Sequence, residues 1–208
     1  MASSAIYRYF PSRDDLLTRL IIEAYDEIGL TAETAQHGAA ARPPDEQFRA
    51  VWQAVRQWAL AHPHQYALIF GSPVPGYAAP TDTIAPATRL PEVLLGILAA
   101  GAAASSSPHG SVAPIAPARP ALPPRALSAA AVAMAPVRAT MPEAAVNDAT
   151  LLAAITSWTT LLGSISFELF GHTHNVVDDS PDRRADFFDA QIDLMLELLG
   201  LTGVRSAS

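Results

Sequence analysis

Apolar residues recur at intervals of three and four along most of this 208-residue chain, and proline or glycine interrupts each series. This spacing places the apolar side chains on one face of an α-helix, whereas a half-buried strand alternates at every second residue. No stretch of the sequence shows that alternation, and no internal repeat is visible. We therefore predict an all-α fold built as a helical bundle.

The first predicted helix spans residues 13–36 and ends before Gly38. Ser12 is the predicted N-cap, because a serine side chain can accept a hydrogen bond from the first turn. Asp15 follows three residues later, close to the spacing of a capping box. Asp14 and Asp15 also suit the positive end of the helix dipole. The helix therefore has a well-marked start.

Further helices are predicted over 45–61, 65–70, 81–104, 148–170 and 182–199. Pro63 separates the first two of these, because proline cannot continue the hydrogen-bond ladder of a helix. The segment 71–77 holds several helix breakers and is predicted to be a loop. Gly200 is the predicted C-cap of the last helix. The inward face of that helix is predicted to carry Phe187, Phe188, Ile192, Met195, Leu196 and Leu199.

Residues 105–142 are rich in alanine, proline and serine, with few large apolar side chains. Such a segment cannot bury enough surface to offset the entropy of ordering it. We predict that most of it is a disordered insertion, with a weak helix over 126–135 from alanine propensity alone.

The composition narrows the class of protein. The net charge of −7 argues against a chain that coats nucleic acid over its whole surface, but it allows a small local contact. The absence of cysteine excludes disulfide scaffolds and thiolate metal sites. The start of the chain lacks the pattern of a signal peptide, and the apolar run 93–104 is shorter than a bilayer requires. We expect a cytoplasmic protein.

Motifs for catalysis and metal binding are weak. His62 and His64 are two residues apart, as are His172 and His174, and this spacing puts helical side chains on different faces. Ser72 lies in a Gly-Ser-Pro sequence that lacks the pattern of a nucleophile elbow. No phosphate-binding loop or dinucleotide fingerprint is present. We predict no catalytic residue, no metal site, no cofactor and no enzymatic activity.

Two sets of acidic residues need separate interpretations. The first set shares one face of the last predicted helix and is interpreted as a solvated surface; it comprises Asp182, Asp186, Asp189 and Asp193. Glu168 differs because it stands alone among apolar residues. It can line a pocket, lie at a dimer interface, or reach the surface as an ordinary exposed acid. The sequence leaves these three alternatives open.

Residues 5–17, AIYRYFPSRDDLL, resemble the end of the helix-turn-helix of TetR-type transcriptional regulators. Ile6 and Phe10 are four apart and can pack together, while neighbouring side chains point elsewhere and can meet phosphates or base edges. In that family the recognition helix enters the major groove by its N-terminus. The resemblance implies DNA contacts by Ser3, Ser4, Tyr7, Arg8, Tyr9 and Arg13.

Three further stretches resemble a C-terminal domain type of actinobacterial TetR/AcrR regulators. They are WALAHP at 58–63, YALIFGSPVPGY at 66–77 and FELFGH at 167–172. The resemblance implies a ligand-responsive DNA-binding regulator, of repressor type, that binds a palindromic DNA operator as a homodimer. It also implies a small hydrophobic effector, with the first predicted helix linking the pocket to the DNA-reading head.

The loop after the third predicted helix leaves space that a small apolar ligand can fill. Large aromatic side chains near it and on the facing helices are the candidate pocket wall. These candidates are Trp58, Phe70, Tyr77, Trp158 and Phe167. Any single one of them can equally be an ordinary core residue.

The family places two helices before the recognition helix, whereas this chain starts at Met1. We therefore interpret residues 1–36 as the remnant of a partial helix-turn-helix head, truncated at the N-terminus. Residues 37–200 are then the ligand-binding and dimerisation bundle, and 201–208 a tail. We expect a start codon upstream of Met1, although a degraded gene or a loss of DNA binding would also account for the short head. The alternative function is a DNA-silent small-molecule-binding and dimerisation module.

Overall fold

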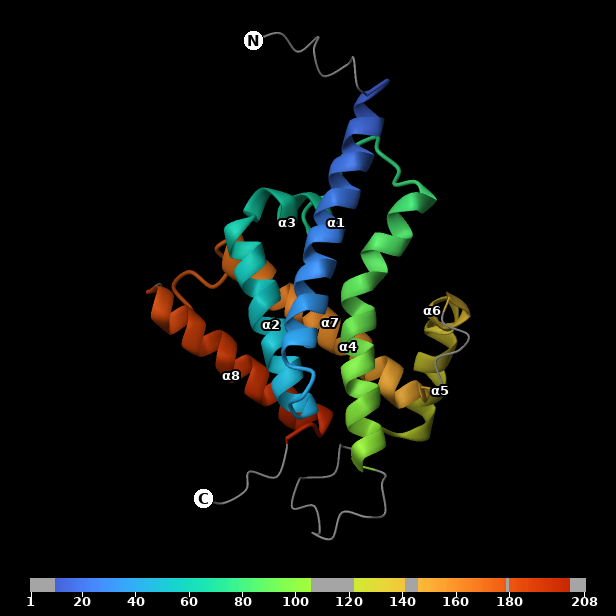
Figure 1. Ribbon diagram of the computed structural model, residues 1–208, viewed down its shortest axis with the longest axis vertical. Coiled ribbons are helices and arrows are strands. Elements are labelled where there is room, and N and C mark those ends of the chain that lie inside the picture. Colours follow the sequence, from blue (N-terminus) through green and yellow to red (C-terminus); the bar gives the residue numbers. More distant parts are fainter. Residues whose placement is uncertain (1–9, 106–121, 141–145, 179, 203–208) are drawn as a thin grey trace.

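The computed structural model describes residues 10–105, 122–140, 146–178 and 180–202 of the chain. Within these ranges it is all-α and contains no strand, as predicted (Figure 1). Five of the predicted DNA-contacting residues lie outside the described residues: Ser3, Ser4, Tyr7, Arg8 and Tyr9. The elements are α1 (Arg13–Gly38), α2 (Pro44–Ala61), α3 (Pro63–Phe70), η2 (Thr81–Thr83), α4 (Ile84–Ser105), α5 (Pro124–Ala133), α6 (Ala135–Thr140), α7 (Asp148–Leu169) and α8 (Pro181–Leu199).

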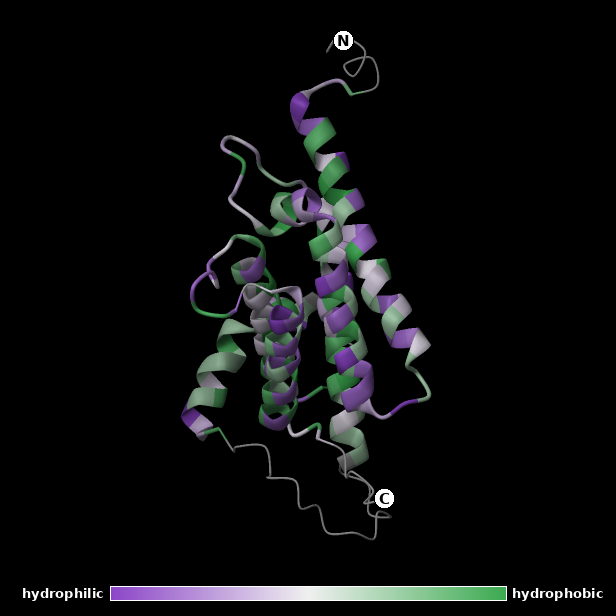
Figure 2. Cartoon of the chain, turned by 90° about the vertical axis from the view of Figure 1, so that its left-hand side faces the viewer, coloured by the Kyte–Doolittle hydropathy of each residue, from purple (hydrophilic) through white to green (hydrophobic). Residues whose placement is uncertain are grey.

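Helix α1 is the axis of the bundle and packs against α2, α3 and α4. Helix α7 crosses behind these helices, and α8 lies on the outer side of α2 (Figure 1). The first turns of α1 project beyond most of the bundle, as the view turned by 90° also shows (Figure 2).

The start of α1 is confirmed as predicted. The backbone N–H of Asp15 donates to Ser12 Oγ at 3.1 Å, and Ser12 Oγ donates to Asp15 Oδ2 at 2.7 Å. The end differs slightly, because the helix continues through Gly38 before Ala39 closes it. Helix α3 begins at Pro63, two residues earlier than predicted, since proline fits the first position of a helix.

The core is formed by the facing sides of α1, α2, α4, α7 and α8. Trp52 is fully buried there, with ring centroids 5.1 Å from Phe48 and 6.0 Å from Phe188. Tyr66 is also fully buried, with its ring against Phe70, and its hydroxyl donates to the carbonyl of Leu162 at 2.8 Å. The short helix α3 is thereby fastened to α7.

Part of the predicted disordered insertion is helical. Residues 122–140 carry α5 and α6, and α5 covers most of the weak helix predicted over 126–135. Met134 is buried in the main core. This burial stabilises the segment beyond what the helix propensity of alanine supplies. Arg138 donates to the carbonyl of Val146 at 2.9 Å and to Asp148 Oδ1 at 2.6 Å. Residues 106–121 and 141–145 lie outside the described part of the chain.

Helix α8 corrects one prediction and extends another. The predicted inward position of Phe187 is wrong, since 42% of its surface is exposed, because the inward face is centred on Phe188 and Ile192. The four aspartates lie on a face that is exposed except at half-buried Asp189, and three of them also have partners, with Asp186 paired to Arg183 at 3.3 Å. Asp189 accepts a hydrogen bond from Gln53 Nε2 at 2.9 Å, and Asp193 forms an ion pair with Arg49. Gly200 caps the helix in the left-handed conformation, at φ 64°, as predicted.

Two stretches, Thr81–Ala104 and Asp148–Leu169, are long and apolar enough to cross a membrane by length and composition. Core helices of folded bundles pass the same test. Both stretches pack inside this bundle, where α4 contacts α1, α2 and α7.

Candidate ligand pocket

A pocket of about 670 Å³ opens between α1, α4 and α7. Helix α3, the loop that follows it, η2 and the short helix α6 complete its wall. This volume is within the range of pockets that hold small organic ligands. Its lining residues are Ile21, Tyr25, Leu68, Ile69, Pro73, Val74, Tyr77, Ala79, Thr83, Ile84, Ala87, Thr88, Pro91, Pro136, Val137, Ile155 and Trp158.

Two of the five predicted pocket aromatics, Tyr77 and Trp158, lie in this wall. The other three lie elsewhere. Trp58 belongs to the core and stacks on the imidazole of His62, with centroids 5.3 Å apart. Phe70 packs on Tyr66 and lines a separate hollow, while Phe167 lines a groove between α7 and α8.

Sequence reasoning missed Tyr25 of α1 and Ile155 of α7. The spacing of apolar residues places Tyr25 and Ile155 on apolar helix faces but does not show that these faces line a pocket. One signal was available for Ile155, because it lies three residues before Trp158 and so shares one side of α7 with it. The contribution of α6 was unpredictable, because the composition of its segment favours disorder.

Helix α3 and the loop after it are each tied to α1 by one hydrogen bond. The hydroxyls of Thr18 and Tyr77 are 2.9 Å apart and hydrogen-bonded. The Tyr25 hydroxyl donates to the carbonyl of Ile69 at 3.3 Å, and burial raises the pKa of Tyr25. Tyr25 and Tyr77 both line the pocket, so a ligand there would touch α1 directly and through the loop.

Arg89 of α4 fastens the C-terminal half of α1. Its guanidinium donates to both carboxylate oxygens of Glu33, at 2.8 and 2.7 Å, and to Asp26 Oδ1 at 2.8 Å. The hydrogen bonds from Arg89 hold the pKa of Glu33 below its usual value. Gly29 lies under the stem of Arg89, where an added β-carbon would be 2.9 Å from Arg89 Cβ. Glycine at this position therefore allows the close approach of α1 and α4.

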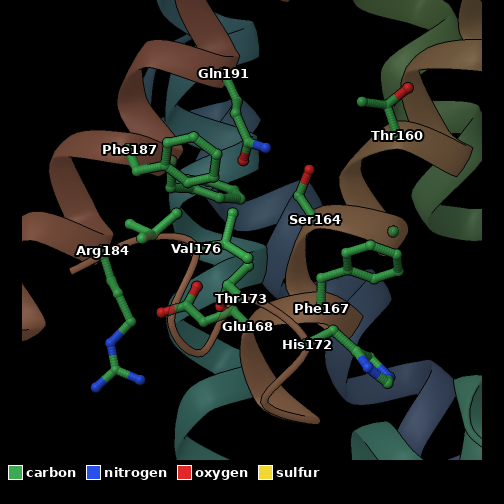
Figure 3. A pocket seen from close by; sticks show the side chains of 13 residues that line it. Thr160, Ser164, Phe167, Glu168, His172, Thr173, Val176, Arg184, Phe187 and Gln191 are labelled. Carbon is green, nitrogen blue, oxygen red and sulfur yellow. The ribbon is translucent and has the colours of Figure 1, made fainter. Parts of the chain in front are cut away.

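A second hollow, of about 500 Å³, lies between α7, α8 and the loop that joins them. We call it the α7–α8 groove. Phe187 and Val176 lie on one side of it, with Ser164 and Phe167 on the other (Figure 3). All three apolar residues are exposed.

Glu168 lies in the wall of the α7–α8 groove and is paired with Arg56 of α2. Arg56 Nε and one terminal nitrogen donate to the two carboxylate oxygens at 2.7 and 2.6 Å. The side chains are only 13% and 10% exposed. The guanidinium also lies over the ring of Phe188, 5.1 Å from its centroid. Glu168 is therefore a largely buried structural acid as well as a groove residue, and no local pattern indicated its partner.

Arg13, the one described residue among the predicted DNA contacts, is exposed in the first turn of α1. His62 Nδ1 lies 2.9 Å from the carbonyl of Trp58, which fits a helix-end role. No group of three or more metal-binding side chains occurs among the described residues.

The family model described as "Tetracyclin repressor-like, C-terminal domain" matches residues 48–195 of the chain. The chain belongs to the TetR family. This confirms the resemblance seen in the sequence. The matched region contains α7, most of α8 and most of the pocket wall, whereas α1 precedes it.

Two curated relatives are 44% identical to the chain over 104 residues. They are HTH-type transcriptional regulator Rv1816 of Mycobacterium tuberculosis (strain ATCC 25618 / H37Rv) and HTH-type transcriptional regulator Mb1846 of Mycobacterium bovis (strain ATCC BAA-935 / AF2122/97). The match covers 50% of this chain and 44% of each relative, so it spans less than half of the relatives' length.

A solved structure resembles the chain over more of its length. The crystal structure of "putative regulatory protein SCO4313" aligns with a TM-score of 0.66 at 28% sequence identity. The alignment covers 94% of this chain and 79% of that chain. The shared fold thus extends beyond the matched domain to α1.

The buried hydroxyl of Tyr66 predicts a loss of stability in alkali. Burial raises the pKa of Tyr66 to about 12, while a tyrosine in an unfolded chain ionises near 10. Between these values the unfolded state releases a proton that the folded state keeps. The free energy of unfolding is therefore undiminished below pH 10 and falls by up to about 1.4 kcal/mol per pH unit above it.

Urea unfolding between pH 9 and 12 measures this effect. The chain has no lysine and no cysteine, so tyrosines dominate the side-chain titration in that range. Tyr66→Phe is expected to flatten the decline. An equally steep decline in Tyr66→Phe would contradict the prediction.

Proposed function

We propose that this chain is the effector-binding and dimer-forming part of a ligand-responsive, DNA-binding transcriptional repressor that acts in the cytoplasm. The observation that carries the proposal is the apolar pocket of about 670 Å³ whose wall includes α1. Helix α1 leads from that wall to the end of the chain that resembles a DNA-reading head. The regulatory character of the family supports a role in binding rather than catalysis.

The proposed mechanism couples the pocket to DNA through α1. A ligand beside Tyr25 and Tyr77 would press on α1 and on the Thr18–Tyr77 hydrogen bond. Arg89 would meanwhile hold the C-terminal half of α1 against α4. The N-terminal half would then shift and alter the spacing of two DNA-reading heads. Coupling energies of this kind are typically about 1–3 kcal/mol.

A gel-shift assay with the DNA upstream of the protein's own gene tests DNA binding. Arg13→Ala is expected to weaken binding and to lower the slope of log affinity against log salt by about one. Arg183→Ala is the matched control, because Arg183 is an exposed arginine at the start of α8. The absence of binding by the unaltered chain would favour the DNA-silent ligand-binding module, the alternative function.

The proposed dimer uses α7 and α8. Phe187, Leu194 and Leu198 follow one another at intervals of seven and four, so they share one face of α8, and all three are exposed. Exposed Phe167 continues this apolar surface on α7. A surface of this kind suits an interface between two copies related by a two-fold axis.

Phe187→Glu is expected to convert the dimer into a monomer, because two carboxylates would be buried where two apolar rings had met. Sedimentation velocity at micromolar concentration measures the change. Leu30→Glu is the control, since Leu30 is a comparably exposed apolar residue on α1. A monomeric unaltered chain, or a dimer that survives Phe187→Glu, would refute this interface.

A further inference from the structure

We propose that α5 and α6 together form a strap that opens and closes one side of the pocket, and that the bonds of Arg138 to the start of α7 are its latch. This inference rests on the proposed function of the pocket and adds a control of ligand entry and exit. The position of the strap, its burial and the contacts of Arg138 support it.

The strap covers part of the pocket. Helix α6 supplies Pro136 and Val137 to the wall. Figure 1 shows α5 and α6 at the edge of the bundle, beside α4 and α7, and α5 packs against α7. An outward movement of α6 would therefore open the pocket on this side and leave the walls formed by α1, α4 and α7 in place.

The strap is lightly held. Among the side chains of 122–139, which the structure describes, Met134 alone is buried. Helices α1, α4 and α7 of the same wall each bury several apolar side chains. Segments with few buried apolar contacts open locally at a low free energy, while the core stays folded. The strap can therefore open without unfolding the bundle.

The loop after α3 is the rival entrance, because it is also little buried. It is fastened to α1 at both ends of its first half, by the Tyr25 bond to the carbonyl of Ile69 and by the Thr18–Tyr77 bond. The strap has no such double tie to α1 among the described residues, and its polar fastening is Arg138. We therefore assign the entrance to the strap.

Arg138 joins the last turn of α6 to the start of α7. Its guanidinium binds the carbonyl of Val146 and the carboxylate of Asp148, the first residue of α7. The side chains of Arg138 and Asp148 are 40% and 45% exposed. Water competes for an ion pair of this exposure, so the pair is easily broken and remade. Arg138 does not line the pocket, and a ligand there would leave the latch free to act.

A latch and a structural contact affect binding differently. If the ligand passes only through the open strap, the rates of entry and exit are both proportional to the population of the open form. Breaking the latch raises that population in the free and the bound protein alike. Both rates then increase and the dissociation constant stays the same. Loss of a contact that only shapes the closed pocket would instead speed exit alone and weaken binding.

Cysteine labelling measures strap opening without any ligand. The chain has no cysteine, so Met134→Cys places a single thiol beneath the strap. Adding Arg138→Ala is expected to speed its reaction with N-ethylmaleimide about fivefold, the upper range for an exposed ion pair. Met195→Cys is the matched reporter, because Met195 is a buried methionine of α8. Its labelling should not respond to Arg138→Ala, and equal acceleration at both thiols would overturn the latch.

Stopped-flow fluorescence with the neutral probe 6-propionyl-2-(dimethylamino)naphthalene measures entry and exit. Arg138→Ala is expected to raise the association and dissociation rate constants by the same factor, about fivefold, at an unchanged dissociation constant. Arg42→Ala is the control, because it breaks the exposed Arg42–Glu46 pair outside the pocket wall and should change neither rate. Ala87→Trp fills the pocket and is expected to abolish binding.

The outcomes separate the strap from the pocket. Thr18→Val removes the bond between the loop and α1; rates that rise in this variant but not in Arg138→Ala would place the entrance at the loop and overturn the strap. A faster exit alone in Arg138→Ala would reduce Arg138 to a structural contact. If the probe does not bind, or binds Ala87→Trp equally well, the proposed effector function of the pocket fails, while the labelling of Met134→Cys still decides whether the strap opens.

Discussion

Glu168→Ala is expected to lower the free energy of unfolding by about 3–5 kcal/mol, the usual cost of removing one member of a buried ion pair. The substitution leaves the guanidinium of Arg56 buried without its two carboxylate bonds. The guanidinium would then lie over the ring of Phe188 without its counter-charge. Urea unfolding, followed by circular dichroism at one protein concentration for all variants, measures the change.

Two controls make this result specific. Arg19→Ala breaks the exposed Arg19–Glu23 pair of α1 and is expected to cost less than about 1 kcal/mol. The double variant Arg56→Met, Glu168→Leu is expected to be more stable than Glu168→Ala, since it removes both charges together. If Glu168→Ala were no more harmful than Arg19→Ala, the pair would not be buried as described.

Trp52→Ala is the second large effect, expected to cost about 3–5 kcal/mol. Trp52 is fully buried between Phe48 and Phe188, so truncation leaves a cavity at the centre of the bundle. Its loss also weakens the support of Phe188, over which Arg56 lies. Combined with Glu168→Ala, the two costs should therefore not be additive.

The same urea titration measures the effect of Trp52→Ala. Val132→Ala in α5 is its control, because Val132 is exposed and its truncation should change stability by less than about 0.5 kcal/mol. Strict additivity of Trp52→Ala and Glu168→Ala would show that Phe188 does not connect the two sites.

Much of the fold could be predicted because local signals determine helix boundaries. Ser12 and Asp15 mark the start of α1, and Gly200 marks the end of α8. Pro63 divides α2 from α3. These residues act on their immediate neighbours, so no knowledge of the tertiary structure is needed. The weak helix predicted over 126–135 matches most of α5, whereas α6 was not predicted, because the burial of Met134 and the bonds of Arg138 to Val146 and Asp148 cannot be deduced from the composition of the segment.

The candidate site was predicted only in part. The loop after α3 and the choice of Tyr77 and Trp158 came from breaker residues and aromatic size. The positions of Trp58 and Phe167 could not be deduced, because a helix places aromatic residues on several faces and packing decides which faces a cavity. The partnerships Arg56–Glu168 and Arg89–Glu33 join residues 112 and 56 positions apart, beyond any local pattern.

In the proposed mechanism, the ion pairs of Arg89 with Asp26 and Glu33 would make α1 a lever with arms of unequal length. We take Gly29, which lies beneath Arg89, as the pivot. The pocket residue Tyr25 is four residues from it, roughly 6 Å along the helix axis. Arg13 is sixteen residues from it, roughly 24 Å along the same axis. A rigid rod turning about Gly29 would therefore move Arg13 about four times as far as Tyr25. A ligand that displaces the short arm by a fraction of an ångström would produce a displacement of ångström size at the long arm's tip.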